Sequence, residues 1–552
     1  MVVLLTIIAI LVAASAALLL KTPLHLFQLN CYRFSEGKIF SSKRVIRQFL
    51  ISASVLAAAA LLWLAFYFVP AVREWVNFAL SAVFTGVLAT IFLKKSKAKK
   101  PLVFTKRAVR LSVMAIFAAL AIFAALSAAA LKTPLSDYFV YLWFYLLPVY
   151  FPFAFVLGAL VIAPLEFLNK LRIKRAAAKK LEKRKDLIKI GITGSFGKTS
   201  VKNILEAILK QRFSVLASEG SFNTPMGLAL TVKKLKEEHQ VLIAEMGARH
   251  RGDIKELTDM IRPTHGIITA VAPQHLATFK SLENVLAAKL DLGFSLPRSG
   301  ALVIGADSEY LSERVKYLYQ KQSEPPNVLK GINLTQPENR LPDKIIFAGT
   351  ADFADVKAIS IAFDGLQSTF DIEYRGGRFP VALPLIGLHN IINIVTAAAL
   401  ALELGVRPSE IAEAVKTLAP TPHRLEVIDG GGITIIDDSF NANIEGTKAA
   451  LDTIRLFLGR KVVLTPGLVE LGSLEHDANY DFGLRLASAA DVVLLVGKRR
   501  TEAIGEGLSA AGFCGAVKLY DSLSEARDDF KNILHAGDVL LIENDLPDNY
   551  EE

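Results

Sequence analysis

The sequence predicts an all-α bundle of transmembrane helices followed by two α/β domains. Five long apolar runs fill the first 168 residues. A glycine-rich loop then follows a short apolar strand at Ile188–Ile192, and beyond it short apolar strands alternate with segments of helical periodicity. Such alternation is typical of a mostly parallel sheet with helices on both faces. A chain of 552 residues is long enough for about three or four domains.

The apolar runs are long enough to cross a bilayer core. Val2–Leu20 contains no charge and only Met1 precedes it, whereas a secretory signal peptide begins with a positive stretch. We therefore expect a retained helix. Buried core helices are the alternative, but so many runs in so short a stretch favour about five membrane spans. The other runs are Phe49–Val69, Trp75–Leu93, Leu111–Leu131 and Tyr138–Leu168, the last interrupted by Pro148 and Pro152.

Charge is divided unevenly along the chain. Residues 1–189 hold 26 Lys and Arg against 6 Asp and Glu, so the remainder is acidic although the whole chain carries +10. A basic surface often indicates nucleic-acid binding, but here the charges lie between apolar runs, at 21–47 and 94–110. Basic loops stay on the cytoplasmic side. We therefore expect a multi-pass protein of the cytoplasmic membrane, with everything after Leu168 in the cytoplasm and no nucleic-acid partner.

A further basic run, Leu171–Lys185, follows the last span. We interpret it as a helix lying along anionic membrane lipids, where each charge contributes roughly 1 kcal/mol; a solvated linker is the alternative. The first four spans contain no acidic or histidine residue, so the bundle lacks the proton relay of a coupled transporter. The two cysteines, Cys31 and Cys514, lie far apart, which suits reduced thiols better than a metal site.

The loop after Ile188–Ile192 has the composition of a phosphate site. Its glycines let successive backbone N–H groups surround phosphate oxygens at the start of the helix Val201–Lys210. The lysine would reach the terminal phosphates and the threonine hydroxyl would bind Mg²⁺. The spacing departs from the usual pattern because Ile192 stands where the first glycine is expected, and a chance match is the alternative. The nucleotide-binding residues predicted here are Gly194, Ser195, Gly197, Lys198, Thr199 and Ser200.

An acid that could serve the metal follows at the end of a buried-type strand. Val241–Ala248 reads VLIAEMGA, and Glu245 could bind Mg²⁺ directly or through water. A lone acid at a strand end is more often incidental. The assignment of Glu245 as a metal ligand is supported by the other motifs that occur with it.

Farther along the chain the pattern changes twice. Short alternating strands between about 327 and 384 indicate an insertion or sheet extension on the central domain. A second alternating set begins at Thr421 and fits a smaller dinucleotide-fold-like domain. Its predicted strands include Lys461–Leu464, Asp491–Val496 and Asp538–Ile542. The expected boundaries are 1–168 for the bundle, 169–187 for the basic segment, 188–418 for the central domain and 419–552 for the C-terminal domain.

Several motifs occur together in one order: TGSFGKTS, SFNTPMGLALTV, EMGARHRGDI, ITAVAPQHLATFKSLENVLAAKLDL, GLHNIINIVTAAALALELGV, PHRLEVID and DDSFNAN. In order and spacing they resemble the Mur ligases, most closely the MurF type, which adds D-alanyl-D-alanine to a UDP-muramoyl tripeptide. The resemblance covers about residues 188–552. It implies a P-loop ATPase central domain, a Rossmann-like C-terminal domain, and a reaction that joins an acid and an amine at the expense of ATP.

The resemblance also implies roles for individual residues. A carboxylate is a poor electrophile, so it first takes the γ-phosphoryl group as an acyl phosphate, which the amine then attacks. Clustered negative charge calls for metals and cations. One Mg²⁺ would lie by Thr199 and Glu245, and a second by His275 and a carbamylated Lys289. From the residues alone, Lys289 would be a plain helix lysine and His275 a loop residue.

Three further residues are implied to complete the ATP site. Asn390 lies in the segment that reaches adenine and ribose, and Asp438 matches an acid that binds the ribose hydroxyls. Arg424 matches an arginine that approaches the γ-phosphate across the interdomain cleft. The implied catalytic set is Lys198, Glu245, His275, Lys289 and Arg424. Because these residues come from different domains, ATP should draw the C-terminal domain closed.

The chain departs from the family pattern where substrates are held. The membrane bundle stands in place of the soluble domain that binds the uridine diphosphate end of the acceptor. Ala270 replaces an expected asparagine and Phe440 an expected tyrosine. The segments Thr465–Gly472 and Glu543–Tyr550 replace two C-terminal loops, the second with an acid in place of a lysine. No DNPR motif is present, which argues against the type that selects diaminopimelate or lysine.

Three classes of function follow. The leading one is a ligase that adds D-Ala-D-Ala, or a related amino acid or dipeptide, to a UDP-linked or lipid-linked peptidoglycan peptide. The second is a related membrane amide ligase for another polymer, such as a poly-glutamate. The third is a non-enzymatic ATP-binding scaffold, which would need no second-metal ligands. The sequence does not choose between the two acceptors or fix the oligomeric state.

Overall fold

The computed structural model describes residues 2–29, 70–92, 102–130, 136–320, 340–364, 367–440 and 442–544, with single residues at 32, 50, 54, 57 and 61. The chain forms two compact units with a boundary between Leu171 and Arg172. Most of the predicted span Phe49–Val69 lies outside the described residues, as do Cys31 and most of the segment Glu543–Tyr550.

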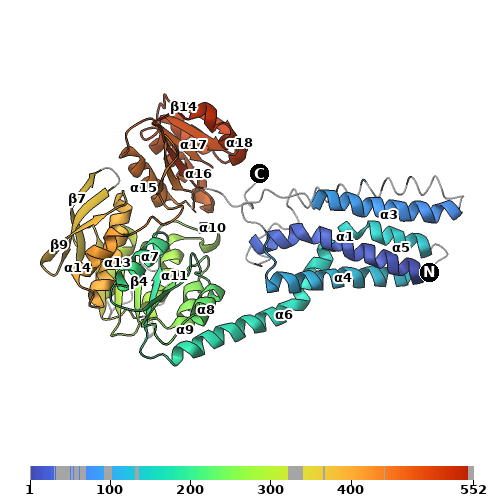
Figure 1. Ribbon diagram of the computed structural model, residues 1–552, viewed down its shortest axis with the longest axis horizontal. Coiled ribbons are helices and arrows are strands. Elements are labelled where there is room, and N and C mark those ends of the chain that lie inside the picture. The colour runs from blue at the N-terminus through green and yellow to red at the C-terminus, as the bar shows by residue number, and fades with distance from the viewer. Residues whose placement is uncertain are drawn as a thin grey trace. The chain divides into compact units, whose positions relative to one another are not determined.

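The first unit is helical, as the apolar runs predict (Figure 1). Its core includes edge-to-face contacts of Phe84 with Phe144 and Tyr145, with ring centroids 5.4 and 5.8 Å apart. The predicted run Tyr138–Leu168 is divided by a turn at Leu146, just before Pro148. The helices are α1 (Val2–Leu29), α3 (Pro70–Phe92), α4 (Lys106–Ala130), α5 (Ser136–Tyr145) and α6 (Leu147–Glu182).

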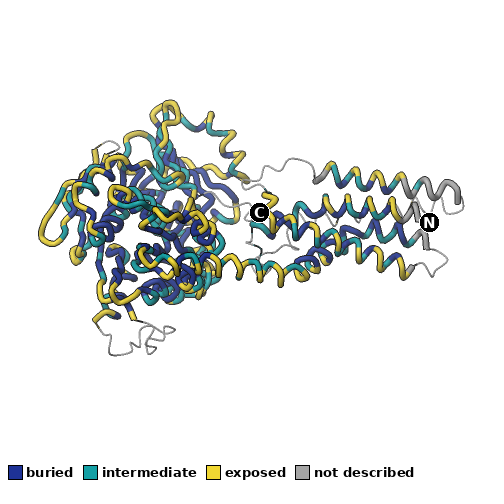
Figure 2. Tube along the Cα trace, turned by 60° about the horizontal axis from the view of Figure 1, so that its bottom comes forward, coloured by how far each residue is buried: buried dark blue, intermediate teal, exposed yellow. Residues whose placement is uncertain are grey.

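Among the described residues, three helices are long and apolar enough to cross a membrane: Thr6–Leu29, Lys106–Ala129 and α6. Ala79–Thr90 of α3 is a shorter apolar helix. Exposed positions recur along these helices (Figure 2), and several of them on α4 and α6 are large apolar residues; Phe117 and Phe153 are 62% and 69% exposed. Helices that are apolar on all sides need an apolar environment, so the burial pattern agrees with the composition.

The basic run predicted to lie along the membrane is the end of α6, and part of it packs into the second unit. Ala177 and Leu181 are buried in the core of the central domain. Lys174 Nζ pairs with Glu256 Oε1 at 2.7 Å. Lys180 donates to the carbonyls of Lys233 and Leu235, where a cation is favourable because α8 ends there. The exposed side of the helix carries Arg172, Arg175 and Lys179, and the exposed Lys183 directly follows its last residue.

The central domain has a nine-stranded sheet in the order β2-β3-β1-β4-β5-β6-β7-β8-β9. The pairs from β2 to β7 are parallel, and β7, β8 and β9 form an antiparallel extension in the predicted insertion. The strands are β1 (Ile188–Thr193), β2 (Val215–Ala217), β3 (Val241–Glu245), β4 (His265–Ile268), β5 (Ala301–Gly305), β6 (Lys344–Gly349), β7 (Val356–Asp364), β8 (Gln367–Tyr374) and β9 (Gly377–Leu383).

Helices cover both faces of this sheet, and two hydrophobic clusters fill the space beneath them (Figure 1). α7, α13 and α14 pack on one face, and α8, α9, α11 and α12 on the other. Strand β3 is buried throughout, as expected for a parallel strand with both faces covered. The helices are α7 (Lys198–Leu209), α8 (Pro225–Lys233), α9 (Asp253–Ile261), α10 (Leu276–Phe279), α11 (Leu282–Phe294), α12 (Glu309–Gln320), α13 (Leu388–Glu403) and α14 (Pro408–Lys416).

The C-terminal domain has a six-stranded sheet in the order β10-β11-β15-β12-β13-β14, parallel except for β10. α15, α16 and α17 cover one face, and α18 and α19 the other. The three strands predicted here are present. The elements are β10 (Glu426–Asp429), β11 (Thr434–Asp438), α15 (Ile444–Arg455), β12 (Lys461–Thr465), α16 (Glu475–Leu486), β13 (Val492–Val496), α17 (Glu502–Ala510), β14 (Ala516–Tyr520), α18 (Leu523–Asp528), α19 (Phe530–Ile533) and β15 (Val539–Glu543).

Candidate functional site

The glycine-rich loop joins the end of β1 to the start of α7. Gly197 precedes the helix at φ 76°, a conformation that favours glycine. A Cβ at Gly194 would lie 2.0 Å from Thr269 Oγ1, and one at Gly197 would lie 2.8 Å from Asn393 Oδ1. Ser195 fixes the loop, because its N–H donates to the carbonyl of Ala270 at 2.8 Å. Only glycine fits at positions 194 and 197 of the loop. The loop therefore presents backbone N–H groups at the start of a helix, where anions bind.

Lys198 lies over the loop at the start of α7. Its ammonium donates to the carbonyls of Gly194 at 2.7 Å and Ser195 at 3.1 Å. Burial lowers the pKa of Lys198 to about 8, with an opposing contribution from Glu245 and a reinforcing one from Arg424. The three charged groups are therefore close enough to influence one another. Thr199 and Ser200 follow in the first turn of α7 and are half-buried.

Glu245 ends β3 and is almost fully buried. Asn223 Nδ2 donates to Glu245 Oε1 at 3.2 Å, whereas Oε2 has no hydrogen-bond partner among the described residues. Lys202 Nζ lies 3.5 Å from Oε2 and donates to the carbonyl of Gly220. A buried carboxylate oxygen without a partner fits a Mg²⁺ ligand.

Lys202 and Asn223 are residues that sequence reasoning missed. Lys202 lies four positions after Lys198 and therefore on the same side of α7, a spacing that the sequence does show. Asn223 stands within the SFNTPMG motif. Nothing in the sequence shows that both converge on Glu245.

Removing the charge of Lys202 should destabilise the protein strongly. The side chains of Lys202 and Glu245 are 2% and 1% exposed, so Lys202→Met would leave a buried carboxylate without its counter-charge. We expect the free energy of unfolding to fall by about 3–5 kcal/mol, the usual cost of breaking a buried ion pair. Denaturant titration of the variant measures it. Lys210→Met is the control, because Lys210 directly follows the last residue of the same helix and is 55% exposed; an equal loss in both variants would contradict the prediction.

The two residues assigned to a second metal lie on neighbouring elements. Lys289, on α11, is 2% exposed, and burial and the charge of Lys198 hold its pKa well below the ordinary lysine value. No hydrogen bond or ion pair of its ammonium occurs within the described part of the chain. His275 precedes α10 at φ 52°, and burial lowers its pKa more than Glu470 raises it.

Glu470 is a further residue that the sequence did not reveal. It belongs to the C-terminal domain, and its carboxylate contacts His275 Nδ1 of the central domain. The same carboxylate lies 3.9 Å from Arg249. The first contact joins residues 195 positions apart, and the second joins residues still farther apart in the sequence, so no local pattern could have shown them.

Arg424 and Asp438 bring the C-terminal domain to the same site. The Arg424 guanidinium stacks on Phe440, 4.4 Å from the ring centroid. Burial lowers the pKa of Arg424, while Asp438 and Glu245 raise it, so the guanidinium faces carboxylates of both domains. Asp438 Oδ1 accepts from the N–H of Leu425 at 3.2 Å.

Asn390 lies at the start of α13, and its Nδ2 donates to the carbonyl of Ile386 at 2.9 Å. This hydrogen bond fixes the Asn390 side chain against the segment that precedes α13. The adjacent His389 has both ring nitrogens buried without a hydrogen-bond partner among the described residues, and burial lowers its pKa to about 4. Unpaired ring nitrogens suit a ligand that supplies hydrogen bonds, such as a nucleotide.

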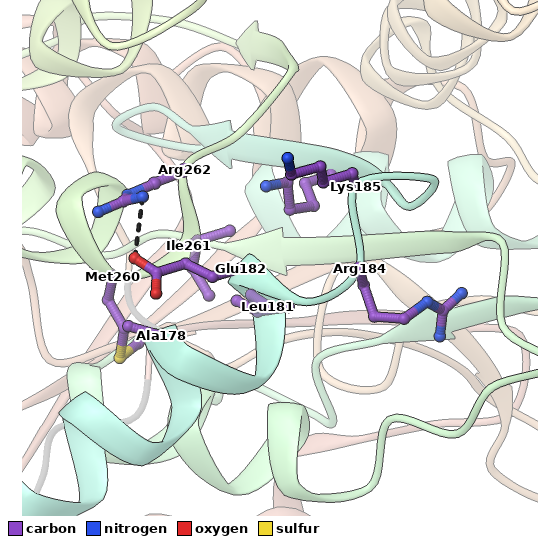
Figure 3. Close-up of a pocket in the computed structure, with 9 residues that line it drawn as sticks. Ala178, Leu181, Glu182, Arg184, Lys185, Met260, Ile261 and Arg262 are labelled. Atoms are coloured by element: carbon purple, nitrogen blue, oxygen red, sulfur yellow. Dashed lines mark ion pairs between the residues drawn. The ribbon is translucent and has the colours of Figure 1, made fainter.

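A cavity of about 320 Å³ lies at the other end of β1, beneath the end of α6 (Figure 3). Glu182 pairs with Arg262 at 3.0 Å on its wall. Arg184 points away from that pair and binds Asp186 at 2.7 Å. Because Lys189, in the cavity wall, is near the start of β1 and Gly194 follows its end, the cavity is separate from the phosphate loop.

Comparison with known proteins gives consistent results. The family model for the Mur ligase middle domain matches residues 192–401, and that for the Mur ligase glutamate ligase domain matches residues 423–543. A UDP-N-acetylmuramoyl-tripeptide–D-alanyl-D-alanine ligase of Mycobacterium tuberculosis strain H37Rv is 32% identical over 315 residues, 56% of this chain and 57% of that protein. The corresponding ligase of Escherichia coli K12 is 30% identical over 313 residues, 56% of this chain and 64% of that protein.

Solved structures share the fold. MurF of Acinetobacter baumannii superposes with a TM-score of 0.59 at 24% identity, covering 69% of this chain and 78% of that one. MurF of Thermotoga maritima, in complex with ADP, gives 0.57 at 22% identity over 68% and 80% of the two chains. The chain spans about three fifths of the length of the curated relatives named above.

Proposed function

Over residues 192–401 and 423–543 the chain belongs to the Mur ligase family, and on that premise we propose that it is an ATP-dependent amide ligase of the MurF type held in a membrane. The main support for the proposal is that Lys198, Glu245 and Arg424 lie close enough for their charges to shift one another's pKa, although they are on separate elements. Two cations and one metal-binding carboxylate at a glycine cradle suit the transfer of a phosphoryl group.

In the first step, the acceptor carboxylate attacks the γ-phosphorus of ATP. ADP leaves and an acyl phosphate forms. The loop from Gly194 to Ser200 would hold the phosphates, and the Lys198 ammonium and the Arg424 guanidinium of the C-terminal domain would supply positive charge to them. Thr199 and Glu245 would hold a Mg²⁺ ion, which supplies positive charge to the phosphates.

In the second step, the donor amine attacks the acyl carbon. The tetrahedral intermediate collapses to an amide and expels inorganic phosphate, which also takes up the proton that the amine loses. His275 and a carbamylated Lys289 would hold a second Mg²⁺. The burial and lowered pKa of Lys289 support this assignment, because CO₂ reacts with a neutral amine.

The contacts between the two domains support a closed catalytic state. Glu470 of the C-terminal domain contacts His275, and Asn203 Nδ2 lies 3.4 Å from Thr421 Oγ1. Asn390, His389 and Asp438 would bind the adenosine part of ATP. Closure of this kind excludes water from an acyl phosphate that water would otherwise hydrolyse.

The substrates proposed first are those in the names of the relatives: a UDP-muramoyl tripeptide as acceptor and D-alanyl-D-alanine as donor. A lipid-linked acceptor is the second candidate. The three span-length helices of the first unit favour it, because they would hold the enzyme at the membrane with its catalytic domains in the cytoplasm. The exposed basic stripe Arg172, Arg175, Lys179 and Lys183 suits contact with anionic lipids.

Product mass spectrometry tests both acceptors. The full chain, in detergent or vesicles, is incubated with ATP, D-alanyl-D-alanine and either the UDP-linked or the lipid-linked tripeptide. We expect the mass of the pentapeptide product and one phosphate released per amide, with neither when the donor is omitted. Coupling to neither acceptor would reject the MurF assignment and favour a ligase for another polymer. Recovery of the full chain in the soluble fraction without detergent would reject the membrane assignment.

A further inference from the structure

Two carboxyl side chains lie side by side where β11 and β15 end. The strands are parallel, and Asp438 is the direct neighbour of Glu543 in their register. Ile436 and Leu541, two positions earlier on the two strands, are both in the core beneath α15, α16 and α17. Because alternate residues of a strand share a face, Asp438 and Glu543 point toward the same helices.

Glu543 is completely buried and lacks ordinary hydrogen-bond partners. Its exposed fraction is 0%, and neither carboxyl oxygen accepts from an amide, a hydroxyl or a cation among the described residues. Its polar neighbour is the carboxyl of Asp438. Two carboxylates this close in a dry environment repel each other, whereas one proton between them turns repulsion into a hydrogen bond.

The charged groups around the two carboxyl groups include a cation, Arg424, that balances one negative charge, that of Asp438. Arg424 and Asp437 act on Asp438, and Asp438 is the charged group that acts on Glu543. Thr465, the last residue of the neighbouring strand β12, is uncharged. On α15, Glu445 pairs with Lys448 and Asp452 pairs with Arg455, each at 2.7 Å. Within the described structure, no cation is placed to neutralise the carboxyl group of Glu543.

We propose that Glu543 is a protonated acid that donates a hydrogen bond to Asp438 and thereby holds Asp438 as the single negative charge facing Arg424. Glu543 is then a positioning residue for Arg424. A second negative charge would draw the guanidinium farther toward β11, away from the Glu245 carboxylate on the other side of the site. Burial raises the pKa of both carboxyl groups, in agreement with a proton held between them.

Infrared spectroscopy of the full chain tests the protonation. The measurement is made at pH 8, above the pKa of about 6 to which burial raises Asp291, so that Asp291 does not contribute. We expect a carbonyl band of a protonated carboxyl that Glu543→Gln removes. Glu502→Gln is the control, because Glu502 is exposed on α17 of the same domain. An unchanged band in Glu543→Gln would overturn the proposal.

The pH dependence of unfolding gives a second test. An acid whose pKa is higher in the folded than in the unfolded state binds its proton more tightly when folded, so stability falls as pH rises above the unfolded value. For glutamate that value is about 4.3. The unfolding temperature of the wild type should therefore fall relative to that of Glu543→Gln as pH rises from 4.5 to 8. A difference that does not change with pH would contradict the proposal.

The role in catalysis rests on the proposed function and is tested separately. Glu543→Gln keeps a hydrogen-bond donor and should release phosphate at nearly the wild-type rate, whereas Glu543→Ala should lower kcat. In an Arg424→Ala background, Glu543→Ala should cause little further loss, because its effect acts through Arg424. Full additivity would reject the positioning role. If no variant and no wild-type sample releases phosphate, the proposed function fails, while the infrared and unfolding tests still decide the shared proton.

Discussion

Lys198→Ala should reduce phosphate release from ATP by a factor of at least about 10²–10³, the usual loss when one group that stabilises transferring charge is removed. The ammonium lies at the glycine loop, where it donates to the carbonyls of Gly194 and Ser195. Burial lowers its pKa to about 8, and when the group is charged, its low-dielectric surroundings strengthen its attraction for an anion.

The measurement is phosphate release in the presence of the acceptor and donor that give product with the wild type. The effect should fall mainly on kcat, because the γ-phosphoryl group carries most of its new charge in the transition state. Lys210→Ala is the matched control: Lys210 follows the last residue of the same helix and pairs with Glu206 at the surface. Unchanged turnover in Lys198→Ala would end the ligase interpretation.

Lys289→Arg should reduce amide formation by about 10²-fold or more, although arginine is the basic side chain most similar in length to lysine. A guanidinium cannot be carbamylated, and the larger group must fit a site that leaves the lysine 2% exposed. The physical basis is the dry environment of Lys289: burial and the neighbouring charge of Lys198 hold its pKa well below the ordinary value. A neutral amine reacts with CO₂ to give a carbamate and a proton, and the carbamate then offers oxygen ligands to Mg²⁺.

Carbon-13 NMR with labelled bicarbonate detects the carbamate directly. We expect a carbamate signal in the wild type that is absent from Lys289→Arg, and lower activity in buffer freed of CO₂. Lys255→Arg serves as control, because Lys255 is 70% exposed on α9 and its amine is not buried. A fully active Lys289→Arg enzyme, or a wild type without the signal, would show that Lys289 acts as an ordinary lysine.

The helices of the first unit show which features of the membrane part amino-acid composition can predict. Apolar runs and the positions of lysines and arginines predicted the helices of the first unit, and three of them meet the length and polarity of a span. The division of the last run into α5 and α6 follows from Pro148, which the sequence shows. The docking of α6 was not predicted: Ala177 and Leu181 enter the core of the central domain, and their alanine-rich context does not distinguish them from a solvated stretch.

The sequence by itself determined the local chemistry of the site. Glycines at 194 and 197, the lysine that follows them and the acid at the end of β3 are set by short-range rules, since the loop geometry accepts only glycine and a strand ends where its apolar run ends. The alternation of strands and helices in both α/β domains was determined in the same way.

Only the tertiary structure decided which of these groups meet and how dry they are. Glu470 reaches His275 from another domain, Lys202 and Asn223 converge on Glu245, and Glu543 lies against Asp438 because β15 enters the sheet between β11 and β12. Burial, in turn, lowers the pKa of Lys289 and raises that of Glu543. The reason is physical: ionisation depends on desolvation and on charges that are close in space, and neither is a property of neighbours in the sequence.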